Sequence, residues 1–153
     1  MKLQLLAALM LSAVATPALA EEWVLVSASA DGGAAVLIDV DSMTDAADGT
    51  HGMRLLTVLK VRTQSLDALI SEVRIDCSAN TIRVGRTSSH DATGKQLAVE
   101  EDRPEFGWDP VKDGSNYGTV AMVACGKTEM PTERYGAGVP VAAVRERLEK
   151  SGS

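Results

Sequence analysis

The 153-residue chain holds only two cysteines, Cys77 and Cys125, and a bond between them would constrain its fold more than any other feature. With two cysteines only one pairing exists. The bridge would close a loop of about fifty residues, and the chain-entropy treatment gives such a loop about 4 kcal/mol of stabilisation. Whether the bond forms depends on the compartment, because disulfides persist in oxidising surroundings and are rare in the cytosol.

The first twenty residues indicate an oxidising compartment. They begin with Lys2, continue with an apolar run and end in small residues at Ala20, which is the pattern of a secretory signal peptide with an A-x-A cleavage site. The apolar run is shorter than the roughly 20 residues that span a bilayer. The alternative, a buried N-terminal helix, is disfavoured because Pro17 would break it. We predict a signal peptide over residues 1–20, cleaved after Ala20, and a periplasmic or secreted protein.

In that compartment a structural disulfide between Cys77 and Cys125 is the favoured state. The alternatives are a pair of free buried thiols and a redox pair, but redox pairs usually have the spacing C-x-x-C. The residue directly after the predicted cleavage site is Glu21 and not a cysteine, so we expect no lipid anchor on the new N-terminus. The shortness of the apolar run leads us to expect no transmembrane anchor either.

Composition limits the class of partner. Loss of Lys2 with the signal peptide leaves 14 basic and 21 acidic residues, a formal net charge of −7, which repels nucleic acids and anionic lipid. The aromatic residues are too few and too scattered to form a base-stacking platform. They are Trp23, Phe106, Trp108, Tyr117 and Tyr135. We expect no nucleic-acid partner and a single domain with a substantial core.

Alternating apolar residues and turn signals predict five strands, at residues 22–29, 34–40, 53–63, 68–77 and 81–87. We expect 41–52 to be a loop and 88–108 to be mostly irregular, apart from a short strand considered at 95–99. Periodicity does not distinguish helix from strand over 115–125. The tail is expected to be extended over 127–139 and helical over 140–150, with Pro140 in the first turn.

We predict no catalytic, metal-binding or cofactor-binding residues. The acidic stretch 39–45 lacks the ligand spacing of a calcium loop. Two histidines and two bonded cysteines do not make an ordinary zinc site. The carboxylates of 100–105 fit a solvated surface better than a glycosidase pair. Ser88, His90 and Asp91 are triad residue types, but triad members normally come from separate segments, so we expect a polar loop and keep a His90-dependent hydrolase only as an alternative.

One basic surface is a candidate partner site. Arg74 and Arg83 share the outward parity of the hairpin formed by the fourth and fifth predicted strands, and Lys60 and Arg62 lie on the strand before it. The alternative is a solvated face with weak cross-strand ion pairs.

The order of several short signals resembles the surface-adhesin protein E family of small exported bacterial proteins, over residues 22–126. The residues that carry the resemblance are Trp23, Val36-Leu37-Ile38-Asp39, Ser42-Met43, Asp76-Cys77, Arg83, Trp108, Ser115 and Cys125. The resemblance implies an α+β fold: an antiparallel sheet of about five to six strands with a helix, formed by 115–125, held on one face by the disulfide. We therefore divide the chain into the signal peptide, a domain over 21–126 and the tail 127–153.

The resemblance also implies a function. We expect a noncatalytic exported binding or adhesion-type module of the bacterial envelope, with an unknown ligand and possible homodimerisation through an exposed sheet edge. The alternative is a periplasmic inhibitor of an enzyme such as lysozyme. Haem, which the family's adhesin has been linked to, would need a His or Tyr beside an apolar groove, whereas His51 and His90 are expected in polar loops. We therefore predict no cofactor.

Overall fold

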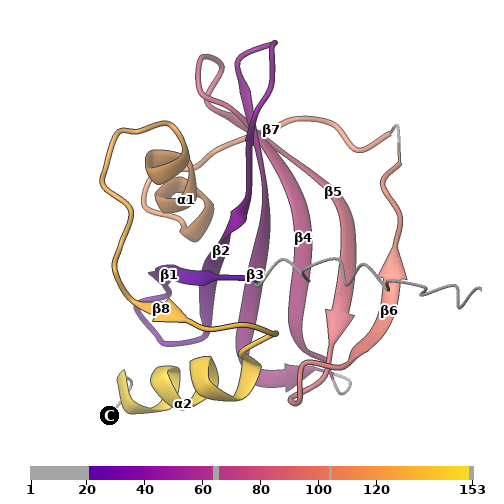
Figure 1. Ribbon diagram of the computed structural model, residues 1–153, viewed down its shortest axis with the longest axis vertical. Helices are drawn as coiled ribbons and strands as arrows, with labels where there is room; N and C mark the ends of the chain where they lie inside the picture. The colour runs from indigo at the N-terminus through magenta and orange to yellow at the C-terminus, as the bar shows by residue number, and fades with distance from the viewer. Residues whose placement is uncertain (1–20, 64–65, 104, 152–153) are drawn as a thin grey trace, which may run out of the picture.

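A computed structural model describes residues 21–63, 66–103 and 105–151, so the predicted signal peptide lies outside the described residues. Within these residues eight strands and two helices follow one another (Figure 1). They are β1 (Trp23–Ala28), β2 (Ala34–Asp45), β3 (Thr50–Thr63), β4 (Leu66–Asp76), β5 (Thr81–His90), β6 (Gln96–Glu100), β7 (Asp109–Pro110), α1 (Asn116–Ala124), β8 (Arg134–Tyr135) and α2 (Val141–Ser151).

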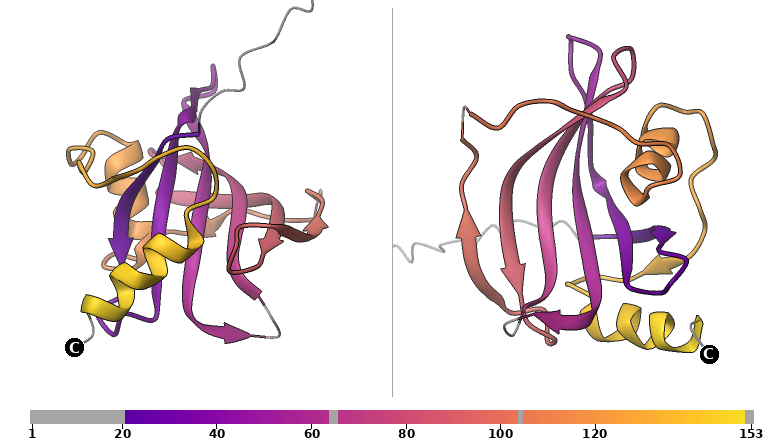
Figure 2. Two further views of the ribbon diagram at one scale, coloured as in Figure 1. Left: turned by 60° about the horizontal axis from the view of Figure 1, so that its bottom comes forward. Right: turned by 180° about the vertical axis from the view of Figure 1, so that it is seen from behind.

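All the strands belong to one antiparallel sheet. Its order is β6-β5-β4-β3-β2-β1-β8, and β7 pairs with β5 beside this path. The right-hand view of Figure 2 shows β6 at one margin of the sheet. The predicted antiparallel sheet is confirmed, but the predicted count of five to six strands is too low. The strands beyond the five predicted from alternation are β6, β7 and β8, and the last two are only two residues long.

Two predicted irregular segments are strand instead. The prediction of a loop over 41–52 is wrong because β2 continues to Asp45 and β3 begins at Thr50. Across this hairpin Thr44 faces Gly52 and Asp45 faces His51. The loop expected at 88–91 is also wrong over its first part, because β5 continues to His90. Backbone pairing extends both strands through polar residues that show no apolar alternation.

A register shift in β5 changes which face its side chains occupy. Val73 pairs with Val84, but Ser71 pairs with Thr87, so Gly85 and Arg86 together lie opposite one residue of β4. Such a bulge inserts one extra residue and inverts the alternation beyond it. Even-numbered residues of β5 therefore face one side of the sheet before the shift and the other side after it.

The sheet has an apolar core on each face, as the neighbours Leu55 and Leu56 of β3 illustrate by belonging to different cores. The first core, on the α1 face, combines sheet residues with four residues of α1. Its helical members are Val120, Ala121, Val123 and Ala124. The second core, on the α2 face, includes Trp23 and Ile70 together with three residues of α2. These are Val141, Val144 and Leu148.

The predicted disulfide is confirmed. Cys77 directly follows β4, and Cys125 is the C-cap residue of α1, with their Cα atoms 5.7 Å apart. Both cysteines pack against the first core. At the other end of α1, the Ser115 hydroxyl caps the helix by accepting a hydrogen bond from the Gly118 amide at 3.0 Å. The disulfide therefore links the C-terminal end of α1 to the end of a central strand.

A buried ion pair joins α2 to the sheet. The side chain of Asp67, in β4, is only 2% exposed and contacts the guanidinium of Arg145. The same guanidinium donates to the Leu59 carbonyl of β3 at 3.1 and 3.3 Å. These contacts fix α2 over one end of the second core and leave the adjoining part of that face uncovered by the helix.

Candidate functional site

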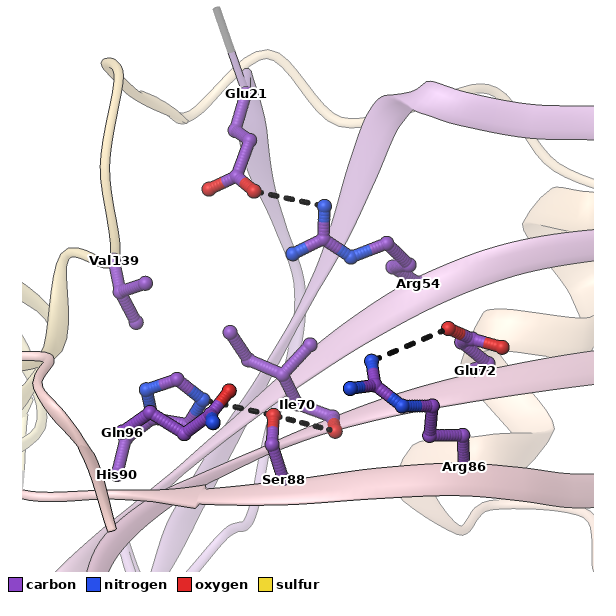
Figure 3. A pocket seen from close by; sticks show the side chains of 9 residues that line it. All are labelled: Glu21, Arg54, Ile70, Glu72, Arg86, Ser88, His90, Gln96 and Val139. Carbon is purple, nitrogen blue, oxygen red and sulfur yellow. Dashed lines mark hydrogen bonds and ion pairs between the residues drawn. The ribbon is translucent and has the colours of Figure 1, made fainter. Parts of the chain in front are cut away.

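A pocket of about 440 Å³ lies on the α2 face of the sheet, where side chains of four neighbouring strands meet (Figure 3). Its lining comes from β3, β4, β5 and β6, from a residue two positions before β1 and from the segment before α2. The lining residues are Glu21, Arg54, Ile70, Glu72, Arg86, Ser88, His90, Gln96 and Val139.

A row of alternating charges crosses the pocket. Arg54 of β3 lies opposite Glu72 of β4 in the strand register. The shift in β5 brings Arg86 to the other side of Glu72, with 3.9 Å between a guanidinium nitrogen and a carboxylate oxygen. Arg86 also contacts Glu101 at 3.3 Å through Nε. The guanidinium groups of Arg54 and Arg86 thus lie on either side of the Glu72 carboxylate in the pocket.

Arg54 is held in place from several sides. Its NH1 nitrogen donates to Glu21 at 2.8 Å and to the buried Asp39 at 3.3 Å. Its guanidinium carbon lies 5.6 Å from the centre of the Trp23 ring, within the range of a cation–π contact. Burial raises the pKa of Asp39, and the positive charge of Arg54 opposes that rise. The Arg54 side chain is therefore a positioned cation with limited freedom.

Ser88 and His90 form a hydrogen-bonded pair at the base of the pocket. His90 Nδ1 lies 2.9 Å from the Gly94 carbonyl, which can only accept, so Nδ1 carries the proton in the neutral ring. His90 Nε2 then accepts from the Ser88 hydroxyl at 2.9 Å. Both residues are buried, at 8% and 5% exposure.

These contacts correct the expectation that both histidines lie in polar loops. His90 ends β5 and is buried in the pocket wall, while His51 lies in β3 and contacts Asp45 at 2.7 Å through Nδ1. Asp91 does not complete a triad with His90. Its carboxylate accepts from the Thr93 amide and hydroxyl and from the Lys95 amide, at 2.7 to 3.0 Å.

The predicted basic surface is brought together only in part. Arg74 and Arg83 lie directly opposite one another, but each contacts a carboxylate: Asp48 at 2.8 Å and Asp102 at 2.6 Å. Arg74 lines a second hollow of about 350 Å³, which shares Arg54 and Glu72 with the pocket.

The other two members of that predicted surface lie on β3. Lys60 is half-buried, with Nζ close to the turn at Gly32. Arg62 belongs to the strand, but its side chain lies outside the described structure. The structure therefore leaves the four-residue partner surface untested and points to a neighbouring group of side chains.

Sequence reasoning missed Arg54 and Arg86 as site residues. Arg86 has the same parity as the core residues Ile82 and Val84, so it occupies an expected inward position. A charged residue at such a position was the available signal for the register shift that sends Arg86 to the other face.

None of the helices in the described segments is long and apolar enough to cross a membrane. Within the same segments no group of three or more His, Cys, Asp or Glu side chains could hold a metal ion.

Comparison with known families gives one match. The family described as surface-adhesin protein E matches residues 23–126, which is more than half of the chain, and the chain therefore belongs to that family. This confirms the resemblance inferred from the order of sequence signals. No significant match was found among curated proteins or among solved structures. The match ends one residue after Cys125, so β8 and α2 lie outside it.

Proposed function

We propose that the protein is a noncatalytic, exported binding module of the bacterial envelope, of the adhesin type, and that it contacts its ligand through the pocket on β3 to β6. The family match supports an adhesin-type role at the surface or outside the cell. The observation that carries the choice of site is the positioned pair Arg54 and Arg86, held on either side of Glu72 in a hollow of about 440 Å³. Guanidinium groups are well suited to recognising carboxylates on a partner.

The hydrogen bonding of the pocket supports a noncatalytic role. Asp91 bonds to its own turn, so His90 is oriented by the Gly94 backbone carbonyl. Ser88 is buried, and its hydroxyl also lies 3.5 Å from the Ile70 carbonyl. A buried, internally bonded Ser–His pair fits a structural base for the pocket better than an activated nucleophile.

Export is part of the proposal. The family supports a surface or exported protein, and the N-terminal pattern supports removal of residues 1–20. Cleavage after Ala20 would make Glu21, a lining residue of the pocket, the first residue of the mature chain. Removal of the signal peptide would therefore create the new N-terminus at the edge of the proposed binding pocket.

Site-directed photo-crosslinking in intact cells tests the proposed site. A photoreactive amino acid at Gln96, in the pocket wall, should yield a discrete adduct with a partner, and Arg86→Gln should abolish it. The same amino acid at Met122, which is 43% exposed on α1, is the matched control and should yield none. Equal adducts at both positions, unaffected by Arg86→Gln, would place the binding site elsewhere.

A further inference from the structure

The pocket on the α2 face adjoins the second hollow, and the two form one groove. The pocket of about 440 Å³ and the hollow of about 350 Å³ share Arg54 and Glu72 as lining residues. The hollow lies toward the β2–β3 hairpin, where Thr44 faces Gly52 across the strand pair. A Cβ atom at Gly52 would lie 2.7 Å from the Thr44 hydroxyl oxygen, so the glycine leaves space beside Arg74 in the hollow. The groove therefore follows β3 and β4 from the hairpin to the pocket.

The groove is closed at its α2 end. The far wall of the pocket consists of Val139, His90 and Gln96. Figure 3 shows them across the pocket from Arg54 and Arg86. Shortly after Val139 the chain forms α2, which packs on the sheet through its buried residues. An extended chain that enters the groove from the hairpin side therefore ends against this wall.

The two arginines direct donors into the space in front of the wall. Arg54 donates to Glu21 and to Asp39 through the same nitrogen, NH1. Arg86 contacts Glu72 through its own NH1. Figure 3 shows the other terminal nitrogen of each guanidinium group pointing toward the middle of the pocket. Two planar guanidinium groups that face one space are suited to a carboxylate between them.

The carboxylate that now lies between the arginines is held loosely. The side chain of Glu72 is 57% exposed, and its contact with Arg86 spans 3.9 Å, which is longer than a hydrogen bond. An exposed pair of this kind contributes little free energy, so a ligand carboxylate can take the place of Glu72. With Glu72 turned to solvent, the lining keeps two arginines and one carboxylate, Glu21. Cleavage after Ala20 would add the α-ammonium group of Glu21 to this edge.

The floor of the pocket beside the arginines is apolar. Ile70 is 7% exposed and belongs to the second core, and Val139 packs against the same core. Aliphatic surface next to a carboxylate position fits a small aliphatic side chain, because its burial is favourable. The side-chain amide of Gln96 offers a donor and an acceptor to a peptide group of the ligand.

We propose that the ligand of the pocket is the free C-terminal carboxylate of a partner protein whose last side chain is small and aliphatic, an inference that rests on the proposed binding function. The carboxylate lies between Arg54 and Arg86, and the last side chain contacts Ile70 and Val139. The preceding residues follow the groove over β3 and β4. A chain end fits this site because an internal segment would have to continue through the closed end of the groove.

NMR titration of the isotope-labelled, disulfide-bonded chain with an N-acetylated pentapeptide of glycine and serine that ends in valine tests the proposal. The peptide should shift the side-chain amide signals of Gln96, and the same peptide with a C-terminal amide should bind about tenfold more weakly or worse. Arg86→Gln should weaken binding by a similar factor. Glu72→Gln should strengthen it about twofold, because the competing carboxylate is gone. Lys127→Gln, at an exposed position after α1, is the matched control and should leave the affinity unchanged.

Two further probes identify the source of the carboxylate. Free valine has no residues to fill the hollow, and an amidated peptide with an internal glutamate has no charged chain end, so both should bind more weakly than the first peptide. The proposal would be overturned by equal binding of either probe, by no shift at millimolar peptide, or by Glu72→Gln weakening binding as much as Arg86→Gln. Circular dichroism of each variant verifies the fold.

Failure of this inference is distinguishable from failure of the proposed function. A crosslinked adduct at Gln96 in cells, together with equal binding of the carboxylate and amide peptides, would keep the binding site and overturn the chain-end ligand. Selective binding of the carboxylate peptide without any adduct in cells would support the chain-end chemistry and count against the proposed role in the envelope.

Discussion

The imidazole of His90 is a buried polar group with both ring nitrogens hydrogen-bonded, to Gly94 and to Ser88. Such a group stabilises the fold only while both partners are kept, because an unpaired buried donor or acceptor costs about 1–3 kcal/mol. Ser88 and His90 are therefore buried polar residues of the core that also line the pocket.

We expect His90→Ala to lower the free energy of unfolding by about 2–3 kcal/mol. The substitution leaves a cavity and removes the hydrogen-bond partner of the Ser88 hydroxyl and of the Gly94 carbonyl. His51→Ala is the matched variant. Its contact with Asp45 is largely exposed, so it should cost less than about 1 kcal/mol. Urea denaturation of the two variants measures the difference, and equal losses would show that the ring of His90 is not a buried bonded group.

The carboxylate of Asp76 contributes an acid-sensitive part of the stability. Its hydrogen bond from the Ser78 hydroxyl, with further bonds from the Ala79 and Ser78 amides, holds the pKa of Asp76 below its usual value. Because the pKa is lower in the folded state, this contribution is present above the unfolded pKa of about 3.9 and is lost as pH falls through the folded pKa.

Asp76→Asn should therefore flatten the loss of stability below about pH 4, as measured by thermal unfolding at a series of pH values. An unchanged pH profile in this variant would mean that the Asp76 turn makes no such contribution.

A disulfide connects α1 to the sheet, and a buried ion pair connects α2 to it. Replacing both Cys77 and Cys125 with Ser opens a loop with a sequence separation of 48. The chain-entropy treatment predicts a loss of about 4 kcal/mol in the free energy of unfolding. Guanidinium denaturation of the variant, beside the oxidised wild type, measures this loss. A change in the free energy of unfolding below about 1 kcal/mol would show that the disulfide does not stabilise the fold as proposed.

The buried contact of α2 gives a parallel test. Arg145→Ala removes the cation beside a carboxylate that is 2% exposed and two bonds to the Leu59 carbonyl, so we expect a loss of about 3 kcal/mol. Arg147→Ala, which removes an exposed pair with Glu133, should cost under about 1 kcal/mol. Indistinguishable melting curves for the two variants would contradict the proposed attachment of α2.

Elements with apolar alternation were predictable from the sequence, and elements built from polar residues were not. The hairpins around Gly32 and Ala79 have alternation and turn residues, so their strands were found. The extensions to Asp45 and His90 are polar, and only backbone pairing with neighbouring strands identifies them. Of the site, Ser88 and His90 were considered only as part of a hydrolase alternative. Arg86 was missed because the bulge beside it breaks the parity rule on which the predicted faces depended.

At the scale of the whole molecule, one sheet carries an apolar core on each face, and the pocket occupies the part of one face beyond α2. The family match ends before α2, although three residues of that helix belong to the second core. The described part of the tail, residues 127–151, is therefore integrated into the fold and also supplies Val139 to the pocket.

The proposed role as an exported binding module requires that the chain leave the cytoplasm, lose its leader and form its one disulfide. Intact-mass spectrometry of the protein recovered from the bacterial envelope or culture medium tests these steps together. The predicted result is the mass of residues 21–153 less two hydrogen atoms, with those two regained on reduction. A chain that keeps residues 1–20, or that carries two free thiols, would contradict the proposal.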